Sequence, residues 1–307
     1  MNMINRCFSL VALTVCFSGC KKAEDHFVDH FPESSVHSDD QARFSTELDA
    51  AINDVNFALA MTPGFTGKVP VVLQPVCDAT IDADTLSNPR VLTLTYNGNN
   101  CLGIRIRTGK IIISMDAATR WKNPGAAVTV NFQNFKSTRL HDNKDMVFNN
   151  KVLITNVSGG VLNELSSLSS ITHTIFSADL EIRFDNGKEW SWKTARKRVY
   201  HEDNGIVITT TGTHAGGNLK GIADWGNNRF GNPFLTPILI PLVIRQDCNF
   251  RIVEGKFEII LTDRLYATAK LGLDSGGNPV SCPDSSYYLE LYWRDNQGSR
   301  RVARLPY

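Results

Sequence analysis

Apolar and polar residues alternate with a period of two along most of this chain, and that alternation constrains its fold more than any other feature. Residues 91–96 read Val-Leu-Thr-Leu-Thr-Tyr, and residues 128–132 alternate Val, Val and Phe with Thr and Asn. Such alternation is typical of a strand with one buried face. Turn sequences that suit hairpins recur between the strand candidates: Asn97-Gly98, Asp185-Asn186-Gly187, Asp203-Asn204-Gly205 and Asp295-Asn296-Gln297-Gly298. We therefore predict an antiparallel all-β body, either a sandwich or a large curved sheet.

One N-terminal α-helix is expected ahead of the strands. Apolar residues with a spacing of three to four form a stripe between residues 40 and 60: Phe44, Leu48, Ile52, Val55 and Leu59. Ser38 or Asp39 is a candidate N-cap, and Pro63 with Gly64 ends the pattern. Charged and polar residues lie off the stripe: Arg43, Glu47, Asp49, Asn53 and Asp54. We expect this helix to pack as a lid on the sheet, and a partner-binding helix is the alternative.

The first twenty residues have the layout of a secretory signal. Arg6 is the one charge among the first nineteen residues, an apolar run covers residues 8–17, and small residues lead to Cys20. The apolar run is shorter than the roughly 20 residues that span a bilayer as a helix. We predict that residues 1–19 are a cleaved signal peptide, and a buried N-terminal helix is the alternative.

Phe17-Ser18-Gly19-Cys20 resembles a bacterial lipobox, with Phe17 in place of the usual leucine. The resemblance implies that Cys20 becomes the new N-terminus and carries fatty acid such as palmitate, so that lipid attaches the chain to a membrane. Removal of Arg6 leaves the chain neutral, because the 32 basic residues of the full sequence face 31 acidic ones. Lys21 stands where many inner-membrane lipoproteins carry aspartate. We therefore expect an outer-membrane lipoprotein, facing either the periplasm or the cell surface.

Polar residues without an apolar period fill residues 20–40, which predicts a flexible, lipid-anchored tether. His26 and His30 have the spacing of two metal ligands on one helix face, but His37 is out of step with them. We expect solvated histidines and no metal site, because structural sites use four ligands.

Residues 41–307 are interpreted as one unit made of the helix and the all-β body. A candidate sub-boundary lies at residues 213–234, which are rich in glycine and asparagine. Residues 234–244 are strongly apolar, and Pro237 and Pro241 interrupt them. Proline donates no hydrogen bond to a sheet, so this segment should be an edge strand or a strand with a bulge.

Four of the seven cysteines remain once the signal is removed and Cys20 is acylated: Cys77, Cys101, Cys248 and Cys282. An even number in an exported protein predicts two disulfides, with three possible pairings. We favour Cys77–Cys101 and Cys248–Cys282, because each pair would bracket adjacent strands. A zinc site of four thiolates is the alternative, although no two of these cysteines have the short spacing of zinc ligands.

Several segments of residues 40–307 match short motifs of a known group of proteins: Leu92 to Gly98 ahead of Cys101, Arg107-Thr-Gly-Lys-Ile-Ile-Ile113, Asn186-Gly-Lys-Glu-Trp190, and Gly255 to Ile260. With them, the chain resembles uncharacterised secreted lipoproteins of Bacteroidota. The resemblance implies a lipobox, an N-terminal helix and an all-β body with cysteine pairs, and it implies no known activity. Near its last cysteine the chain has Ser281-Cys-Pro-Asp284 instead of the usual Gly-Asp-Gly-Thr-Cys-Asp.

The sequence contains no familiar catalytic, phosphate-binding or dinucleotide motif, so no catalytic residue and no cofactor is predicted. If residues 189–199 form one strand, alternate side chains share a face: Trp190, Trp192, Thr194, Arg196 and Arg198. An exposed tryptophan pair beside guanidinium groups would suit sugar stacking or acidic glycans, which makes these tryptophans and arginines candidate ligand-binding residues. The alternative is that the tryptophans belong to the core.

We expect a lipid-anchored cell-envelope protein without enzymatic activity, either structural or binding a glycan or an envelope protein. The alternative is a carbohydrate-active or other hydrolytic accessory protein whose site is assembled in space. Nucleic acid is not an expected partner, because a net charge of +1 gives little attraction for a phosphate backbone. Membrane contact is expected through the lipid on Cys20.

Overall fold

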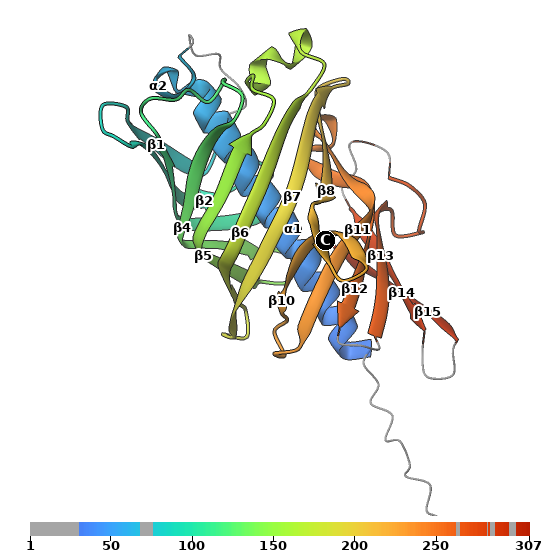
Figure 1. Cartoon of the computed structure of the whole chain (residues 1–307). Coiled ribbons are helices and arrows are strands. Elements are labelled where there is room, and N and C mark those ends of the chain that lie inside the picture. Colours follow the sequence, from blue (N-terminus) through green and yellow to red (C-terminus); the bar gives the residue numbers. More distant parts are fainter. Residues whose placement is uncertain (1–30, 68–75, 262–264, 281, 283–285, 295–298) are drawn as a thin grey trace, which may run out of the picture.

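A computed structural model of the chain describes residues 31–67, 76–261, 265–280, 282, 286–294 and 299–307 (Figure 1). The predicted signal peptide at residues 1–19, Cys20, His26, His30 and the predicted turn at residues 295–298 lie outside this part of the chain. No helix among the described residues has both the length and the apolar character needed to cross a bilayer.

Within the described residues, fifteen strands form one antiparallel sheet, so the large curved sheet is observed rather than a sandwich (Figure 1). Its main path runs β1-β2-β3-β4-β5-β6-β7-β10-β11-β12-β13-β14-β15. The strands have the following bounds: β1 (Ala79–Asp84), β2 (Arg90–Asn99), β3 (Arg105–Met115), β4 (Ala126–Arg139), β5 (Lys144–Asn156), β6 (Ile171–Phe184), β7 (Glu189–Glu202), β8 (Ile206–Gly212), β9 (His214–Gly216), β10 (Leu219–Asn227), β11 (Pro233–Arg245), β12 (Arg251–Leu261), β13 (Leu265–Leu273), β14 (Tyr288–Arg294) and β15 (Arg300–Pro306).

The predicted alternation decides which face of each strand is buried. In β2, Leu92, Leu94 and Tyr96 are buried and the residues between them are half-buried. The same alternation in β4 buries Val128 and Val130 on the concave side of the sheet. Because the period is two, all these side chains lie on one face and form a continuous core.

Two of the predicted hairpin turns are confirmed and one is wrong. Residues 185–187 join β6 to β7, and residues 203–205 join β7 to β8. Asn97 and Gly98 instead lie inside β2, because both still pair with β3. The chain reverses after them, where the amide of Gly103 donates to the carbonyl of Asn100 over 2.9 Å.

The helix α1 (Phe31–Met61) crosses the concave side of the sheet (Figure 1). Every residue of its predicted apolar stripe, from Phe44 to Leu59, is fully buried. The prediction that the helix ends before Pro63 is also confirmed, since a separate short helix, α2 (Pro63–Thr66), follows. Two 3-10 turns are also present among the described residues: η1 (Leu162–Ser167) and η2 (Gln246–Cys248).

Three expectations about this helix are wrong. It begins at Phe31, so Ser38 and Asp39 lie inside it rather than at its cap, and residues 31–40 are not a flexible tether. His37 is fully buried rather than solvated. The helix is also enclosed rather than placed as a lid, because the sheet curves around it and meets its polar side as well (Figure 1).

Arginines from the strands, and one from the turn between β10 and β11, make it possible to bury the polar side of α1. They form ion pairs with its acidic residues: Arg139 with Asp39 (2.9 Å), Arg229 with Asp40 (2.5 Å), Arg105 with Glu47, Arg196 with Asp49 (3.2 Å) and Arg107 with Asp54 (2.8 Å). Loss of either partner would leave a buried charge unpaired, which is strongly unfavourable. These pairs therefore tie the helix to one position inside the sheet.

The sheet continues through the candidate sub-boundary at residues 213–234. That segment holds β9 and β10, and β10 pairs with both β7 and β11. β8 also pairs with β7 and β11, so β8 and β10 both lie between these two strands. β11 thus has neighbours on both sides and is not an edge strand, whereas its predicted bulges are observed as register shifts against β12 around Ile240.

The four cysteines of the body form two disulfides. Cys77 is bonded to Cys101 and Cys248 to Cys282, with Cα atoms 5.2 Å and 4.9 Å apart, respectively. The predicted pairing is confirmed, and all four sulfur atoms are taken up in bridges rather than in the alternative zinc site.

Candidate functional site

The predicted ligand-binding face of β7 is present, but it points into the protein. Trp192, Arg196 and Arg198 alternate along the strand as expected, yet each is at most 1% exposed. Trp190, at the end of the same row, is partly buried against the core. The expectation of an exposed tryptophan pair is therefore wrong, because this face of the strand meets α1.

Trp192 is a core residue held from several sides. Its ring packs against Phe44 of the helix at 4.8 Å and against Phe234 of β11 at 4.6 Å, measured between ring centroids. Its indole nitrogen donates to the carbonyl of Asn227 over 2.8 Å. A buried tryptophan with its one donor satisfied belongs to the scaffold.

Arg196 and Arg198 belong to a buried network of charges. Arg196 lies between Asp49 of the helix (3.2 Å) and Asp224 of β10 (2.6 Å). Arg198 pairs with Asp49 too, and its guanidinium donates to the side chain of Asn53 over 3.2 Å. Both guanidinium groups are already matched by carboxylates and enclosed, so neither is available to a ligand.

A cavity of about 440 Å³ lies elsewhere, where strands from the two ends of the sheet approach each other. Its volume is in the range of small-ligand sites. Residues from separate parts of the chain line it: Gly103, Ile104, Arg105, Arg139, Leu140, His141, Arg251, Ser286, Tyr287, Tyr288, Pro306 and Tyr307. Three arginines and three tyrosines thus face one space, which is the chemistry of an anion site with aromatic walls.

Two of the three cavity arginines already have carboxylate partners. Arg105 pairs with Glu47 of the helix. Arg139 pairs with Asp39 over 2.9 Å and with Asp142 over 2.6 Å. Although burial acts in the opposite direction, the hydrogen bonds and the positive charge of Arg139 hold the pKa of Asp142 at about 2. These two arginines are therefore neutralised.

Arg251 has no such side-chain partner in the described structure. Within the described part of the chain, no side-chain carboxylate pairs with it, and its one hydrogen bond runs to a main-chain oxygen of Tyr307, the last residue of the sequence. Its Nε is buried without an acceptor in the described structure. Burial, together with repulsion from Arg105, lowers the pKa of Arg251. Among the described residues, the cavity thus contains one arginine that has no side-chain carboxylate as its ion-pair partner.

Two tyrosine rings hold this guanidinium in place. Its carbon lies 4.5 Å from the ring centroid of Tyr287 and 5.8 Å from that of Tyr307. The hydroxyl of Tyr307 is fixed in turn, because it donates to the carbonyl of Ile252 over 2.6 Å and accepts from the amide of Gly272 over 3.0 Å. Cation–π contacts orient the arginine but do not neutralise it.

Both disulfides lie next to segments that line the cavity. Cys101 precedes Gly103 by two residues, and Cys248 precedes Arg251 by three. Cys282 precedes Ser286 by four. Cross-links at these places restrict the segments that carry the cavity walls. Sequence reasoning missed the cavity. The signal available for it was an arginine a few residues after a disulfide-bonded cysteine: Arg105 after Cys101 and Arg251 after Cys248.

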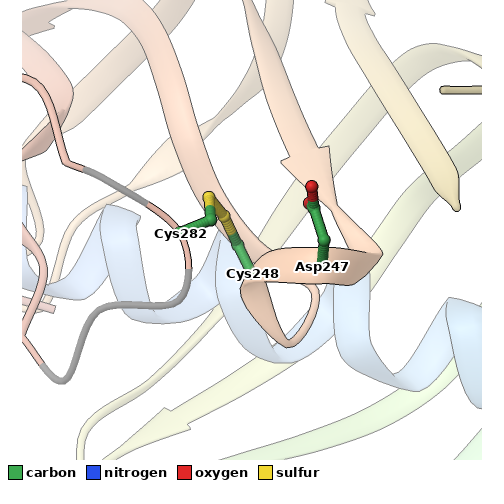
Figure 2. Close-up of side chains that lie close together, drawn as sticks. All are labelled: Asp247, Cys248 and Cys282. Carbon is green, nitrogen blue, oxygen red and sulfur yellow. A yellow bond between two sulfur atoms is a disulfide. The ribbon is translucent and has the colours of Figure 1, made fainter. Parts of the chain in front are cut away.

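Asp247 lies close to the Cys248–Cys282 pair, as Figure 2 shows. Sulfur and carboxylate groups at such distances resemble a set of metal ligands. However, the two sulfur atoms are bonded to each other, and the carboxylate of Asp247 accepts two hydrogen bonds of 2.9 Å from Arg245. We therefore interpret this cluster as a disulfide beside a surface ion pair.

No known family model, curated protein or solved structure matches this chain. The fold itself defines an all-β protein whose sheet encloses a polar helix, with an arginine- and tyrosine-lined cavity between distant strands. The resemblance to secreted lipoproteins of Bacteroidota stays a prediction from the sequence.

Proposed function

We propose that this protein is a non-enzymatic binding protein of the cell envelope, anchored to the outer membrane through lipid on Cys20, and that its cavity binds a sugar-sized ligand with an anionic group. The observation that carries the binding role is Arg251, a guanidinium held between two tyrosine rings without a side-chain carboxylate partner among the described residues. A ligand carboxylate or phosphate would form a charge-assisted hydrogen bond with this guanidinium.

The other cavity residues suit the body of such a ligand. Tyr288 is half-buried at the cavity and offers an aromatic ring, and Leu140 adds an apolar contact. His141 is about half exposed at the rim, where it can reach a hydroxyl group. A few polar groups on an aromatic and apolar wall are typical of sites for small molecules.

The state of the neighbouring acids supports binding rather than catalysis. Each neighbouring acid forms an ion pair with a cavity arginine: Glu47 with Arg105, and Asp39 and Asp142 with Arg139. A carboxyl group with a pKa of about 2, as in Asp142, is a poor proton donor near neutral pH. Acids held in this way stabilise the arginines and are badly placed to exchange protons with a substrate.

Calorimetric titration of the full chain in detergent tests the binding role. The probes are galacturonate, glucose 6-phosphate, inorganic phosphate and neutral glucose, so that the source of the anion can be told apart. We expect an anionic sugar to bind, and Arg251→Gln to weaken its binding by about tenfold or more, because a charge-assisted hydrogen bond is worth about 1.5–3 kcal/mol.

Arg245→Gln is the matched control, since Arg245 is an arginine whose partners lie on the surface, away from the cavity lining. It should bind the anionic sugar as the wild-type protein does. Equal binding of neutral and anionic sugars, or equal affinity of the wild-type protein and the Arg251→Gln variant, would contradict the proposal.

Labelling with a palmitate analogue tests the anchor separately. The wild-type chain should take up the label and fractionate with outer membranes, whereas Cys20→Ser should remain unlabelled. Label that persists in the Cys20→Ser variant would exclude this cysteine as the lipid site and leave the binding role to be judged by calorimetry.

A further inference from the structure

The sheet ends in two strands that each have one unpaired edge. Among the described residues, β1 pairs with β2 alone and β15 with β14 alone. The two strands lie far apart in Figure 1, at opposite ends of the sheet. Both are mostly exposed, and their lengths of 6 and 7 residues are closely matched. An exposed edge is a template on which another strand can pair.

The outer faces of these edge strands carry opposite charges. In β1, Ile81 stands opposite the buried Leu94, so Asp82 and Asp84 project from the other, convex face. In β15, Leu305 stands opposite the buried Leu289, so Arg300 and Arg304 project from the convex face as well. One edge is therefore acidic and the other basic.

The acidic groups of β1 lack a cationic partner in the described part of the chain. Neither Asp82 nor Asp84 forms an ion pair with a described residue. Asp84 accepts hydrogen bonds from the amides of Leu86 (3.0 Å) and Ser87 (3.1 Å), contacts that favour its charged form. On the other edge, Arg304 contacts Glu290 over 3.1 Å, but Arg300 lies on the ring of Tyr292 instead of pairing with an acid in the described structure.

Charge then decides which edges can meet. Two β1 edges would bring aspartates together, and two β15 edges would bring arginines together, so like charge opposes both arrangements. A β1 edge and a β15 edge from different molecules would place opposite charges across from each other. We infer that β1 of one copy of this chain pairs with β15 of a second copy, which extends the sheet from molecule to molecule.

An antiparallel register satisfies both faces of such a pair. With Asp82 opposite Arg304, Ile81 would stand opposite Leu305 on the concave side, and Asp84 would lie diagonal to Arg300. Opposite charges and apolar groups in cross-strand positions both stabilise a sheet. Because the two edges differ, the contact is head-to-tail and leaves one edge open on each outer molecule, so chains longer than dimers form.

Analytical ultracentrifugation of the full chain, over a wide range of concentration, tests this inference. We expect species larger than the monomer that grow with concentration and shrink with added salt, because exposed charges are screened. Reversal of the acidic edge (Asp82→Arg with Asp84→Arg) should weaken self-association by about tenfold or more. Reversal of the basic edge (Arg300→Asp with Arg304→Asp) should do the same.

Combination of all four reversals in one chain should restore association, since the edges are again complementary. This rescue separates an edge contact from a fold defect, which four surface changes would not repair; unchanged circular dichroism serves as the check on folding. A wild-type chain that stays monomeric at every concentration, or variants that associate as the wild-type chain does, would overturn the inference.

Discussion

Arg196 and Arg251 both project from strands toward the inside of the curved sheet, yet their surroundings differ in one respect. Arg196 is fully enclosed between two aspartates, whereas Arg251 faces a cavity and has tyrosine rings around it but no described carboxylate side chain as a partner. A buried charge needs a partner. Where the chain supplies that partner, the arginine holds the fold together. Where the chain leaves it out beside a cavity, a ligand can supply it.

The largest expected effect comes from the matched arginine. Asp224→Ala removes an aspartate that accepts hydrogen bonds from Arg196 (2.6 Å), Gln41 (2.6 Å) and Thr194 (2.8 Å). It would leave Arg196 with one carboxylate in a dry interior, and we expect the free energy of unfolding to fall by about 3–5 kcal/mol. Urea denaturation would measure this, and a loss below about 1 kcal/mol would show that the network contributes little to holding the helix.

Intermediate effects are expected from two buried histidines that lie beside this network. Burial, and secondarily the positive charge of Arg229, lowers the pKa of His37 to about 3. Burial, with a smaller effect from Arg198, lowers the pKa of His173 to about 3 as well. Both ring nitrogens of each histidine lack a described hydrogen-bond partner, so each ring is held neutral.

The sign of the pH dependence follows from these shifts. Between pH 6.5 and about 3 the unfolded chain binds a proton at each histidine and the folded chain does not, so acid favours unfolding. Between pH 7 and pH 5, we expect the free energy of unfolding to fall by about 1–2 kcal/mol less in the His173→Phe variant than in the wild-type protein. The raised pKa values of the buried Asp40 and Asp54 act in the opposite direction, but they are common to both proteins and cancel.

Urea denaturation of both proteins at pH 7 and pH 5 checks the histidine prediction. The phenyl ring should fit, because His173 packs between aromatic rings of Trp121 (5.1 Å) and Tyr200 (4.8 Å). If the variant and the wild-type protein lose the same stability between the two pH values, His173 is not held neutral in the folded state.

The smallest effect on stability should come from the unmatched arginine. Arg251→Met removes a cation that has no described side-chain carboxylate partner, so we expect the free energy of unfolding to change by no more than about 1 kcal/mol. Arg105→Met, in the same cavity, would leave Glu47 without its arginine and should cost several times more. Equal losses for the two variants would remove the distinction between a structural and a ligand-binding arginine.

The sequence was informative wherever the signal was local. Alternation in β2 and β4, the turns at residues 185–187 and 203–205, and the cysteine pairs were all predicted correctly. The first turns of α1 were missed because His37, Asp39 and Asp40 show no apolar period. Polar helix residues can be buried when strands far away in sequence bring arginines to them, and no local pattern reveals that.

The two groups of candidate site residues illustrate the same limit. The alternation on β7 correctly placed Trp192, Arg196 and Arg198 on one face, but which face is enclosed depends on how the whole sheet curves. The cavity needs Arg105, Arg251 and the tyrosines near the end of the described chain, which the sequence separates widely. Only the tertiary fold shows which of the described cavity arginines lacks a side-chain carboxylate partner.

Nuclear magnetic resonance of the arginine Nε–H groups in the full chain tests most directly whether Arg251 binds the anion. The Arg251→Lys variant is used to assign the Arg251 signal. Titration with an anionic sugar should shift the Arg251 resonance to a saturating limit and leave that of Arg196 in place, while neutral glucose should leave both unchanged. An Arg251 signal that stays in place while the anionic sugar binds, or that moves equally with glucose, would contradict the claim that this arginine receives the anion.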